Sequence, residues 1–158
     1  MFAGSGALGL EALSRWGGTA LFVDSSRAAL DCIRENIFRL KFEDRTRLIQ
    51  RDLSKGIDFL MPRKRPFDLI FMDPPYGKGW GELIIPPLLR LPILEDKGLL
   101  VLEHDQSEAV PREAGKWGIG DERRYGRTRI SFYVLPNKSN GPMDLQAEEA
   151  EPMEKVKR

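Results

Sequence analysis

Residues 2–15 have the sequence Phe-Ala-Gly-Ser-Gly-Ala-Leu-Gly-Leu-Glu-Ala-Leu-Ser-Arg, and this stretch decides the fold. Gly4, Gly6 and Gly9 form the spacing G-x-G-x-x-G, which leads directly into apolar residues at helical spacing. Glycines allow a tight turn and a close approach of the backbone to a ligand, and the start of a helix offers free N–H groups. The stretch therefore predicts a cofactor-binding loop ahead of a helix, with a purely structural glycine turn as the alternative.

Downstream of this loop, short apolar runs alternate with segments of helical periodicity. Strand-like runs occupy 19–24, 46–52, 67–73 and 99–104. Helical patterns occupy 25–40, 54–61 and 82–91. The alternation predicts an α/β protein with a doubly wound, mostly parallel sheet.

Three details refine this prediction. Ser25 or Ser26 can cap the first of these helices. Pro86 and Pro87 are expected to break or bend the last one. Residues 121–126 and 128–135 are typical of a terminal antiparallel strand pair joined near Gly126.

The 158 residues suit a single domain, but the first strand of the expected sheet is truncated. Only residues 1–3 precede the glycine loop, whereas a typical strand has about 5–6 residues. In the expected order the first strand is central, so each of its two neighbours would have an unpaired edge. We therefore expect residues 1–136 to form an N-terminally truncated domain whose start lies upstream. Residues 137–158 contain two prolines, no aromatic residue and many charges, which predicts a disordered tail.

The composition excludes several classes of protein. Hydrophobic residues make up 41% of the chain and charged residues 31%, and the formal net charge is +1. This balance is typical of soluble globular proteins, and no apolar run approaches the roughly 18 residues that cross a membrane. A single cysteine, Cys32, and a single histidine, His104, exclude a disulfide framework and a multi-cysteine zinc site. We expect a cytoplasmic, monomeric protein without a metal, in which His104 is structural.

The tetrapeptide Asp73-Pro74-Pro75-Tyr76 begins at the last residue of the strand-like run 67–73. Open α/β sheets bind their ligands at this carboxyl end of the strands. The carboxylate of Asp73, joined by the carbonyl of Pro74, can accept hydrogens from an exocyclic amine, and the Tyr76 ring can stack on a planar base. A hydride-transferring enzyme has no use for this arrangement, which favours S-adenosylmethionine over a nicotinamide as the cofactor.

Three stretches of the chain resemble the RsmD family of Rossmann-like, S-adenosylmethionine-dependent methyltransferases. They are residues 2–15, residues 73–76 and the sequence Tyr-Gly-Arg-Thr-Arg-Ile-Ser-Phe-Tyr at 125–133. The resemblance covers residue 2 to about residue 135. The family methylates the N2 amino group of a guanine in bacterial 16S ribosomal RNA. The resemblance therefore implies a Rossmann-like fold, a role in rRNA processing, and ribosomal RNA or the small ribosomal subunit as partner.

The resemblance also implies which residues bind the cofactor. Asp24, which comes 20 residues after Gly4 at the end of the second expected strand, would hold the ribose hydroxyls. Asp52 would lie beside the adenine amino group, and Leu53 would pack on the adenine ring. The methionine part would be contacted by Gly4, Ser5 and Gly6.

For the acceptor, the resemblance implies that Asp73, Pro74 and Tyr76 orient the guanine and that Glu103 belongs to the same pocket. Phosphate contacts would come from the basic residues Lys78, Arg123, Arg124 and Arg127. Two alternatives stay open. The first is an amino-methyltransferase that acts on adenine N6 in DNA or on a protein glutamine. The second is a non-catalytic truncated fragment that binds RNA or the cofactor.

Overall fold

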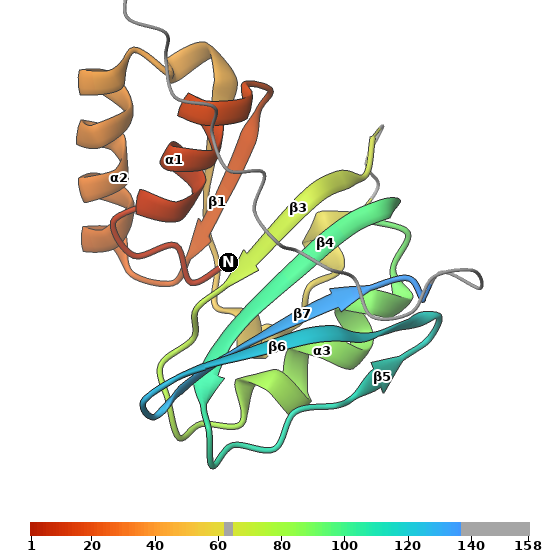
Figure 1. The fold of residues 1–158 in the computed structure, drawn as a ribbon. Helices are drawn as coiled ribbons and strands as arrows, with labels where there is room; N and C mark the ends of the chain where they lie inside the picture. Colours follow the sequence, from red (N-terminus) through yellow and green to blue (C-terminus); the bar gives the residue numbers. More distant parts are fainter. Residues whose placement is uncertain (62–64, 137–158) are drawn as a thin grey trace, which may run out of the picture.

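The computed structural model describes residues 1–61 and 65–136, so the tail expected at 137–158 lies outside the described residues. The α-helices within these ranges are α1 (Ala7–Trp16), α2 (Arg27–Leu40) and α3 (Trp80–Arg90). The strands are β1 (Ala20–Asp24), β2 (Thr46–Gln50), β3 (Phe67–Met72), β4 (Leu94–Asp105), β5 (Glu113–Ala114), β6 (Trp117–Tyr125) and β7 (Thr128–Val134). Figure 1 shows their arrangement in space.

The strands form two sheets. β1 and β2 pair in parallel, with Ala20 opposite Thr46. The larger sheet has the order β3-β4-β7-β6-β5, in which β3 and β4 are parallel and the other pairs are antiparallel. β6 and β7 form a hairpin around Gly126, with Tyr125 opposite Thr128. The predicted α/β class and the terminal antiparallel pair are therefore confirmed.

Each sheet packs against its own helices (Figure 1). α1 and α2 lie on the small sheet, where the core residues are Leu10, Phe22, Leu30, Ile33 and Ile37. The predicted cap of α2 is Ser26, whose Oγ accepts a hydrogen bond from the N–H of Ala29 at 3.3 Å. The larger core lies where α3 packs on the five-stranded sheet and includes Leu100 and Leu102, both fully buried.

The helix predicted at 54–61 is absent, and two short 3-10 turns, Leu53–Lys55 and Asp58–Leu60, take its place. Gly56 lies between them with a φ of 97°, a conformation that an α-helix cannot contain. The backbone conformation of Gly56 therefore prevents a continuous α-helix over this segment.

α3 runs without a break through Pro86 and Pro87, although proline removes a backbone donor from the helix. Burial explains why the helix persists. The apolar residues on its inner face are each no more than 3% exposed, and they are Ile84, Ile85, Leu88 and Leu89. Burying one such side chain contributes roughly 1.5–3 kcal/mol, so together they offset the lost hydrogen bonds.

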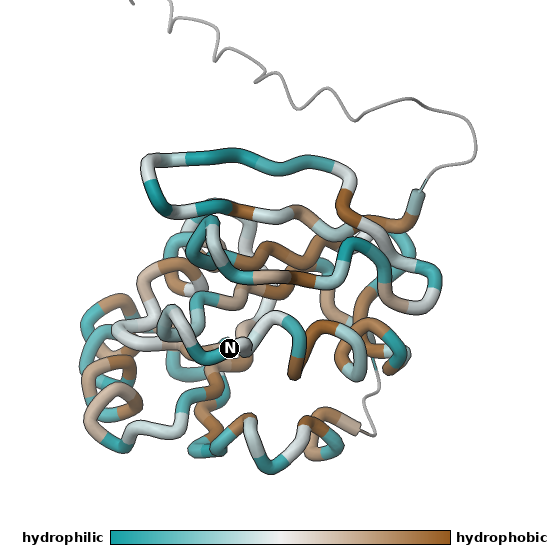
Figure 2. The backbone as a smooth tube through the Cα atoms, turned by 90° about the horizontal axis from the view of Figure 1, so that it is seen from below, coloured by the Kyte–Doolittle hydropathy of each residue, from teal (hydrophilic) through white to brown (hydrophobic). Residues whose placement is uncertain are grey.

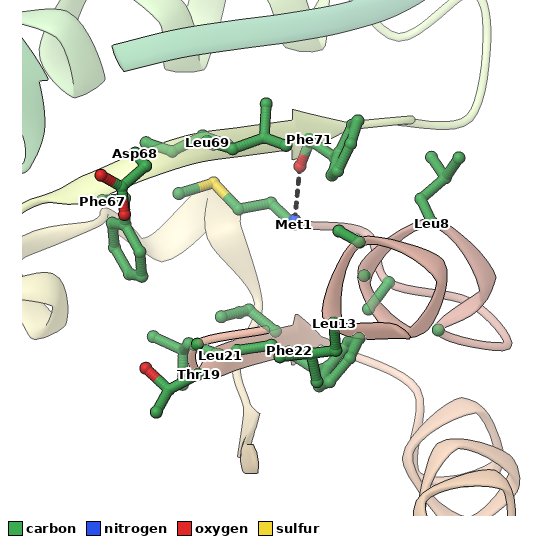
Figure 3. Close-up of a pocket in the computed structure, with 18 of the residues that line it drawn as sticks. Met1, Leu8, Leu13, Thr19, Leu21, Phe22, Phe67, Asp68, Leu69 and Phe71 are labelled. Carbon is green, nitrogen blue, oxygen red and sulfur yellow. Dashed lines mark hydrogen bonds between the residues drawn. The ribbon is translucent and has the colours of Figure 1, made fainter. Parts of the chain in front are cut away.

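β1 and β3 belong to different sheets and face each other across a cavity of about 800 Å³ (Figure 3). Within the described residues, neither strand is paired with another strand on this side. Residues 1–3 join the two strands. The amino group of Met1 donates to the carbonyl of Phe71 at 2.7 Å, and the N–H of Ala3 donates to the carbonyl of Val23 at 3.1 Å.

Candidate active site

The glycine loop turns tightly at the N-terminus of α1. Gly4 and Gly6 have φ values of 54° and 79°, in the left-handed region that favours glycine. The N–H of Gly6 donates to the carbonyl of Ala3 at 2.7 Å and closes the turn. Gly6 is also the N-cap residue of α1, and it has no side chain to cap the helix. The first-turn N–H groups of α1 are therefore available to a ligand.

Two of the glycines also let α1 approach the small sheet closely. A β-carbon at Gly6 would lie 3.1 Å from Cγ1 of Ile33, on α2. A β-carbon at Gly9 would meet the ring of Phe22, on β1. The three predicted glycines thus serve two purposes, because the first two shape the loop and the third sets the distance between helix and strand.

Asp24 ends β1 and binds the backbone of both the glycine loop and the start of α2. Its Oδ2 accepts the N–H of Gly4 at 3.0 Å, and its Oδ1 accepts the N–H of Ser26 at 2.8 Å. A carboxylate offers about four lone-pair positions on its two oxygens. Asp24 therefore keeps acceptor capacity for the hydroxyl groups of a ligand.

Asp52 and Leu53 follow β2 and, with Asp24, line a small pocket of about 30 Å³. Oδ1 of Asp52 accepts hydrogen bonds from the hydroxyl and the N–H of Ser54, at 2.7 and 3.0 Å, and these bonds lower the pKa of Asp52. Leu53 is only 4% exposed, so most of its side chain belongs to the core. The structure brings the three residues expected at ribose and adenine to one place.

Asp73 follows β3 directly and lines the large cavity together with Gly4, Ser5 and Gly6. Partial desolvation raises the pKa of Asp73, and the negative charge of Glu103 raises it further, whereas the amino group of Met1 acts in the opposite direction. That amino group is itself buried. Burial lowers its pKa to about 6, although the negative charges of Asp24 and Asp73 oppose the shift. The residues expected to bind the methionine part and the acceptor therefore share one cavity.

The Tyr76 ring is held at its hydroxyl end. The hydroxyl donates to Oε1 of Glu103 at 2.7 Å and lies 3.0 Å from Oγ1 of Thr128. One residue further on, the N–H of Gly77 donates to Oε1 of Glu108 at 2.7 Å. Tyr76 is 43% exposed, which leaves its ring accessible to a ligand.

Thr128 and Glu108 were not expected at the site from the sequence. They lie 52 and 31 residues from their partners in the loop, so no local pattern connects them. One signal could have identified Thr128, because it belongs to the stretch 125–133 that carries part of the family resemblance. Glu108 lies outside the three stretches that carry the resemblance, so the sequence gives no signal for it.

The basic residues expected to contact RNA are all exposed: Lys78, Arg123, Arg124 and Arg127. The three arginines lie at the tip of the β6–β7 hairpin, which Figure 2 shows as a strongly hydrophilic segment. The contact of Thr128 with Tyr76 places this tip next to the tetrapeptide.

Each of these arginines has a partner within the hairpin or its surroundings. Arg123 pairs with Asp121 at 3.1 Å, and Nε of Arg124 donates to the carbonyl of Gly126 at 3.1 Å. Arg127 is paired, at 3.1 Å, with Oδ2 of the buried Asp105. These contacts orient the guanidinium groups while leaving them at the surface.

His104 is only 2% exposed. One of its ring nitrogens lies 2.9 Å from Oγ of Ser131 and the other 3.0 Å from the carbonyl of Asp105, which supports a structural role.

Cys32 is exposed on α2. In the described ranges, no group of three or more His, Cys, Asp or Glu side chains is arranged to hold a metal ion. The helices of the same ranges include none with the length and apolarity to span a membrane.

Known proteins are similar to this chain in sequence and in fold. The family described as conserved hypothetical protein 95 matches residues 1–134. Ribosomal RNA small subunit methyltransferase D of Escherichia coli is 32% identical over 143 residues, which are 90% of this chain and 69% of the relative. The protein of the same name from Haemophilus influenzae is 31% identical over 134 residues, which are 84% of this chain and 68% of the relative.

A solved structure of a conserved hypothetical protein from Streptococcus pyogenes matches with a TM-score of 0.73 and 32% identity. The match covers 85% of this chain and 82% of that chain. The chain therefore belongs to the RsmD family, and the resemblance seen in its motifs is confirmed.

Proposed function

We propose that this member of the RsmD family transfers a methyl group from S-adenosylmethionine to the exocyclic N2 of a guanine in 16S ribosomal RNA. Its relatives from Escherichia coli and Haemophilus influenzae bear the name ribosomal RNA small subunit methyltransferase D. The observation that carries the proposal is the shared cavity, which is lined both by the glycine loop and by Asp73. A methyl donor and an amine acceptor bound to these two motifs would be neighbours.

The donor set fits S-adenosylmethionine. The first-turn N–H groups of α1 and the backbone of Gly4, Ser5 and Gly6 suit the carboxylate and amine of its methionine part. Asp24 has acceptor capacity for ribose hydroxyls, and Asp52 lies in the same small pocket as an acceptor for the adenine amine. This cofactor supplies a methyl group already activated on a positively charged sulfur.

The tetrapeptide would prepare the acceptor. Asp73 and the carbonyl of Pro74 would accept hydrogen bonds from N2, which oppose delocalisation of the nitrogen lone pair into the ring. Tyr76 would stack on the base, a contact typically worth about 1–3 kcal/mol. Asp73 would then take the proton that the nitrogen releases on methylation, and its raised pKa makes it a better acceptor for that proton. Alignment and electrostatic placement would thus provide most of the acceleration.

The hairpin tip would bind the RNA backbone. Arg123, Arg124 and Arg127 are exposed beside Tyr76, and Lys78 follows the tetrapeptide. Phosphate contacts fix the position of a nucleic acid but carry no base information, so the choice of base rests on the pocket. If the target guanine is paired, extruding it costs a few kcal/mol, which stacking on Tyr76 offsets.

The proposal is tested by transfer of tritiated methyl groups from S-adenosylmethionine to unmethylated 16S RNA or 30S particles. The Asp73→Asn variant should lower kcat by about 10²–10³-fold, because the amide cannot accept the proton. Asp44→Asn is a matched control, since it makes the same chemical change away from the cavity. Asp44 is exposed in the short turn Glu43–Arg45. Its kcat should stay within about twofold of the parent chain.

Parallel reactions with duplex DNA and with a release factor protein separate the alternatives. Methylation of either one, with none of the RNA, would contradict a guanine acceptor. Equal RNA methylation by the parent chain and by Asp73→Asn would contradict the role of the tetrapeptide. Binding of S-adenosylmethionine in calorimetry, with no transfer to any acceptor, would identify a non-catalytic fragment.

A further inference from the structure

Glu103 lies beside the tetrapeptide on the neighbouring strand. In the parallel pairing of β3 with β4, Met72 is opposite Leu102, so Asp73 and Glu103 come next on the two strands. Side chains alternate between the faces of a sheet, and both Met72 and Leu102 are buried in the core. Asp73 and Glu103 therefore emerge together on the opposite face, where the site lies.

The hydroxyl of Tyr76 is the anchored end of an otherwise accessible ring. Its partners are Oε1 of Glu103 at 2.7 Å and Oγ1 of Thr128 at 3.0 Å, which come from two adjacent strands, β4 and β7. A side chain that is 43% exposed is not fixed by packing alone. The hydrogen bond to a carboxylate is of the stronger, charge-assisted kind.

We propose that Glu103 is a positioning residue of the acceptor site, which holds the Tyr76 hydroxyl and so fixes the plane of the ring against which the base stacks beside Asp73. This inference rests on the proposed function, because it concerns how the acceptor is presented for methyl transfer. Thr128 assists from the hairpin. This contact links the stacking ring of Tyr76 to the hairpin that carries the three arginines.

The same geometry gives Glu103 an electrostatic effect. Its negative charge raises the pKa of Asp73, after the larger contribution of desolvation, and the amino group of Met1 opposes both. The hydrogen bond with Thr128 acts to lower the pKa of Tyr76. The bond to Glu103, some burial and the charges of Glu103 and Asp73 outweigh it, so the net shift is upward. Removing the charge of Glu103 should therefore lower the pKa of both Asp73 and Tyr76.

The test compares Glu103→Gln with Tyr76→Phe in methyl transfer to RNA. Tyr76→Phe keeps the ring but loses the anchor, and it should lower kcat/KM by about 10–100-fold, the range of a hydrogen bond to a charged group. Glu103→Gln keeps an acceptor oxygen but loses the charge, and we expect a loss of about 3–10-fold. Combining the two changes should lower kcat/KM little further than Tyr76→Phe alone, since both act on the same contact. The Kd for S-adenosylmethionine should stay within about twofold in every variant.

A pH profile distinguishes positioning from a general loss of structure. Glu103→Gln should move the acid limb of kcat/KM to lower pH, because Asp73 loses a neighbouring negative charge. Glu108→Gln is the matched comparison, since Glu108 also holds the loop through Gly77 but does not contact Tyr76. It should leave the acid limb in place even if it lowers the rate.

The outcomes separate this inference from the proposed function. Suppose that the parent chain methylates RNA and that Glu103→Gln has the same kcat/KM and the same acid limb. This result would overturn the positioning role and leave the proposed function intact. An acid limb that moves equally in Glu103→Gln and Glu108→Gln would also overturn it. A parent chain that binds S-adenosylmethionine but methylates no RNA would overturn the function and this inference together.

Discussion

Gly9 of α1 lies against the ring of Phe22 on β1, so close that a β-carbon at residue 9 would be 2.5 Å from Cε1 of the ring. Phe22 is itself only 4% exposed and belongs to the core between the helices and the small sheet. The third glycine of the motif therefore serves to bring α1 close to β1. It sets how near the helix N-terminus, and with it the loop, can approach the strand that ends in Asp24.

We expect Gly9→Ala to destabilise the protein. The added methyl group must displace Phe22, and overpacking of this kind typically costs about 1–3 kcal/mol. Alanine is a better helix former than glycine by roughly 1 kcal/mol, which reduces the net loss. Urea denaturation measures the difference, and Ser14→Ala, on the exposed side of the same helix, should instead stabilise slightly. A Gly9→Ala variant more stable than the parent chain would refute the close approach.

Asp24→Asn should weaken S-adenosylmethionine binding by about 10-fold or more, because a charged acceptor for two hydroxyl groups becomes a neutral amide. The amide keeps one oxygen to accept a backbone N–H, so the loss of stability should be the smaller effect. Isothermal titration calorimetry gives the Kd, with Asp44→Asn as the control. An unchanged Kd in Asp24→Asn would place the ribose elsewhere.

The rate of methyl transfer should fall in acid as Asp73 takes up a proton, because only the ionised carboxylate can take the proton that the amine releases. Desolvation and Glu103 raise the pKa of Asp73 above its ordinary value of 3.8. Activity is therefore full above the raised pKa and is lost as the pH falls through it, at a higher pH than for an ordinary aspartate. A kcat/KM profile that stays flat down to the ordinary value would contradict this assignment.

Replacing Arg123, Arg124 or Arg127 with alanine should weaken RNA binding and reduce its dependence on salt. Each lost phosphate contact lowers the slope of log Kd against log salt by about one unit. Filter binding over a series of salt concentrations measures this slope. Arg39→Ala provides the control, since Arg39 is also exposed but lies on α2, where its partner is Glu35. Equal slopes in the hairpin and control variants would exclude the hairpin from the RNA interface.

The sequence predicted the elements whose signals are local. The apolar run of β3, the serine cap of α2 and the turn at Gly126 depend on neighbouring residues, and each lies where expected. α3 was misjudged because the burial that sustains it through Pro86 and Pro87 comes from distant parts of the chain. Propensity describes a segment in isolation, and tertiary packing can override it.

The same distinction applies to the site. The glycine loop and the tetrapeptide are contiguous, so their spacing identified them, and the carboxyl ends of the strands bring Asp24 and Asp52 together. The anchoring of Tyr76 depends instead on the register of β4 against β3 and β7, which no short stretch of sequence encodes. The hydroxyl of Thr128 on β7 and the carboxylate of Glu103 on β4 meet at the Tyr76 hydroxyl only after the sheet has formed.

The division between the two sheets has a consequence for the geometry of methyl transfer. The glycine loop belongs to the small sheet and Asp73 to the large one, and the hydrogen bonds of Met1 and Ala3 link β3 and β1 across the cavity. In the proposed function the cofactor contacts the small sheet and the acceptor base contacts the large one. The separation of the methyl donor from the acceptor nitrogen therefore depends on how residues 1–3 hold the two sheets together.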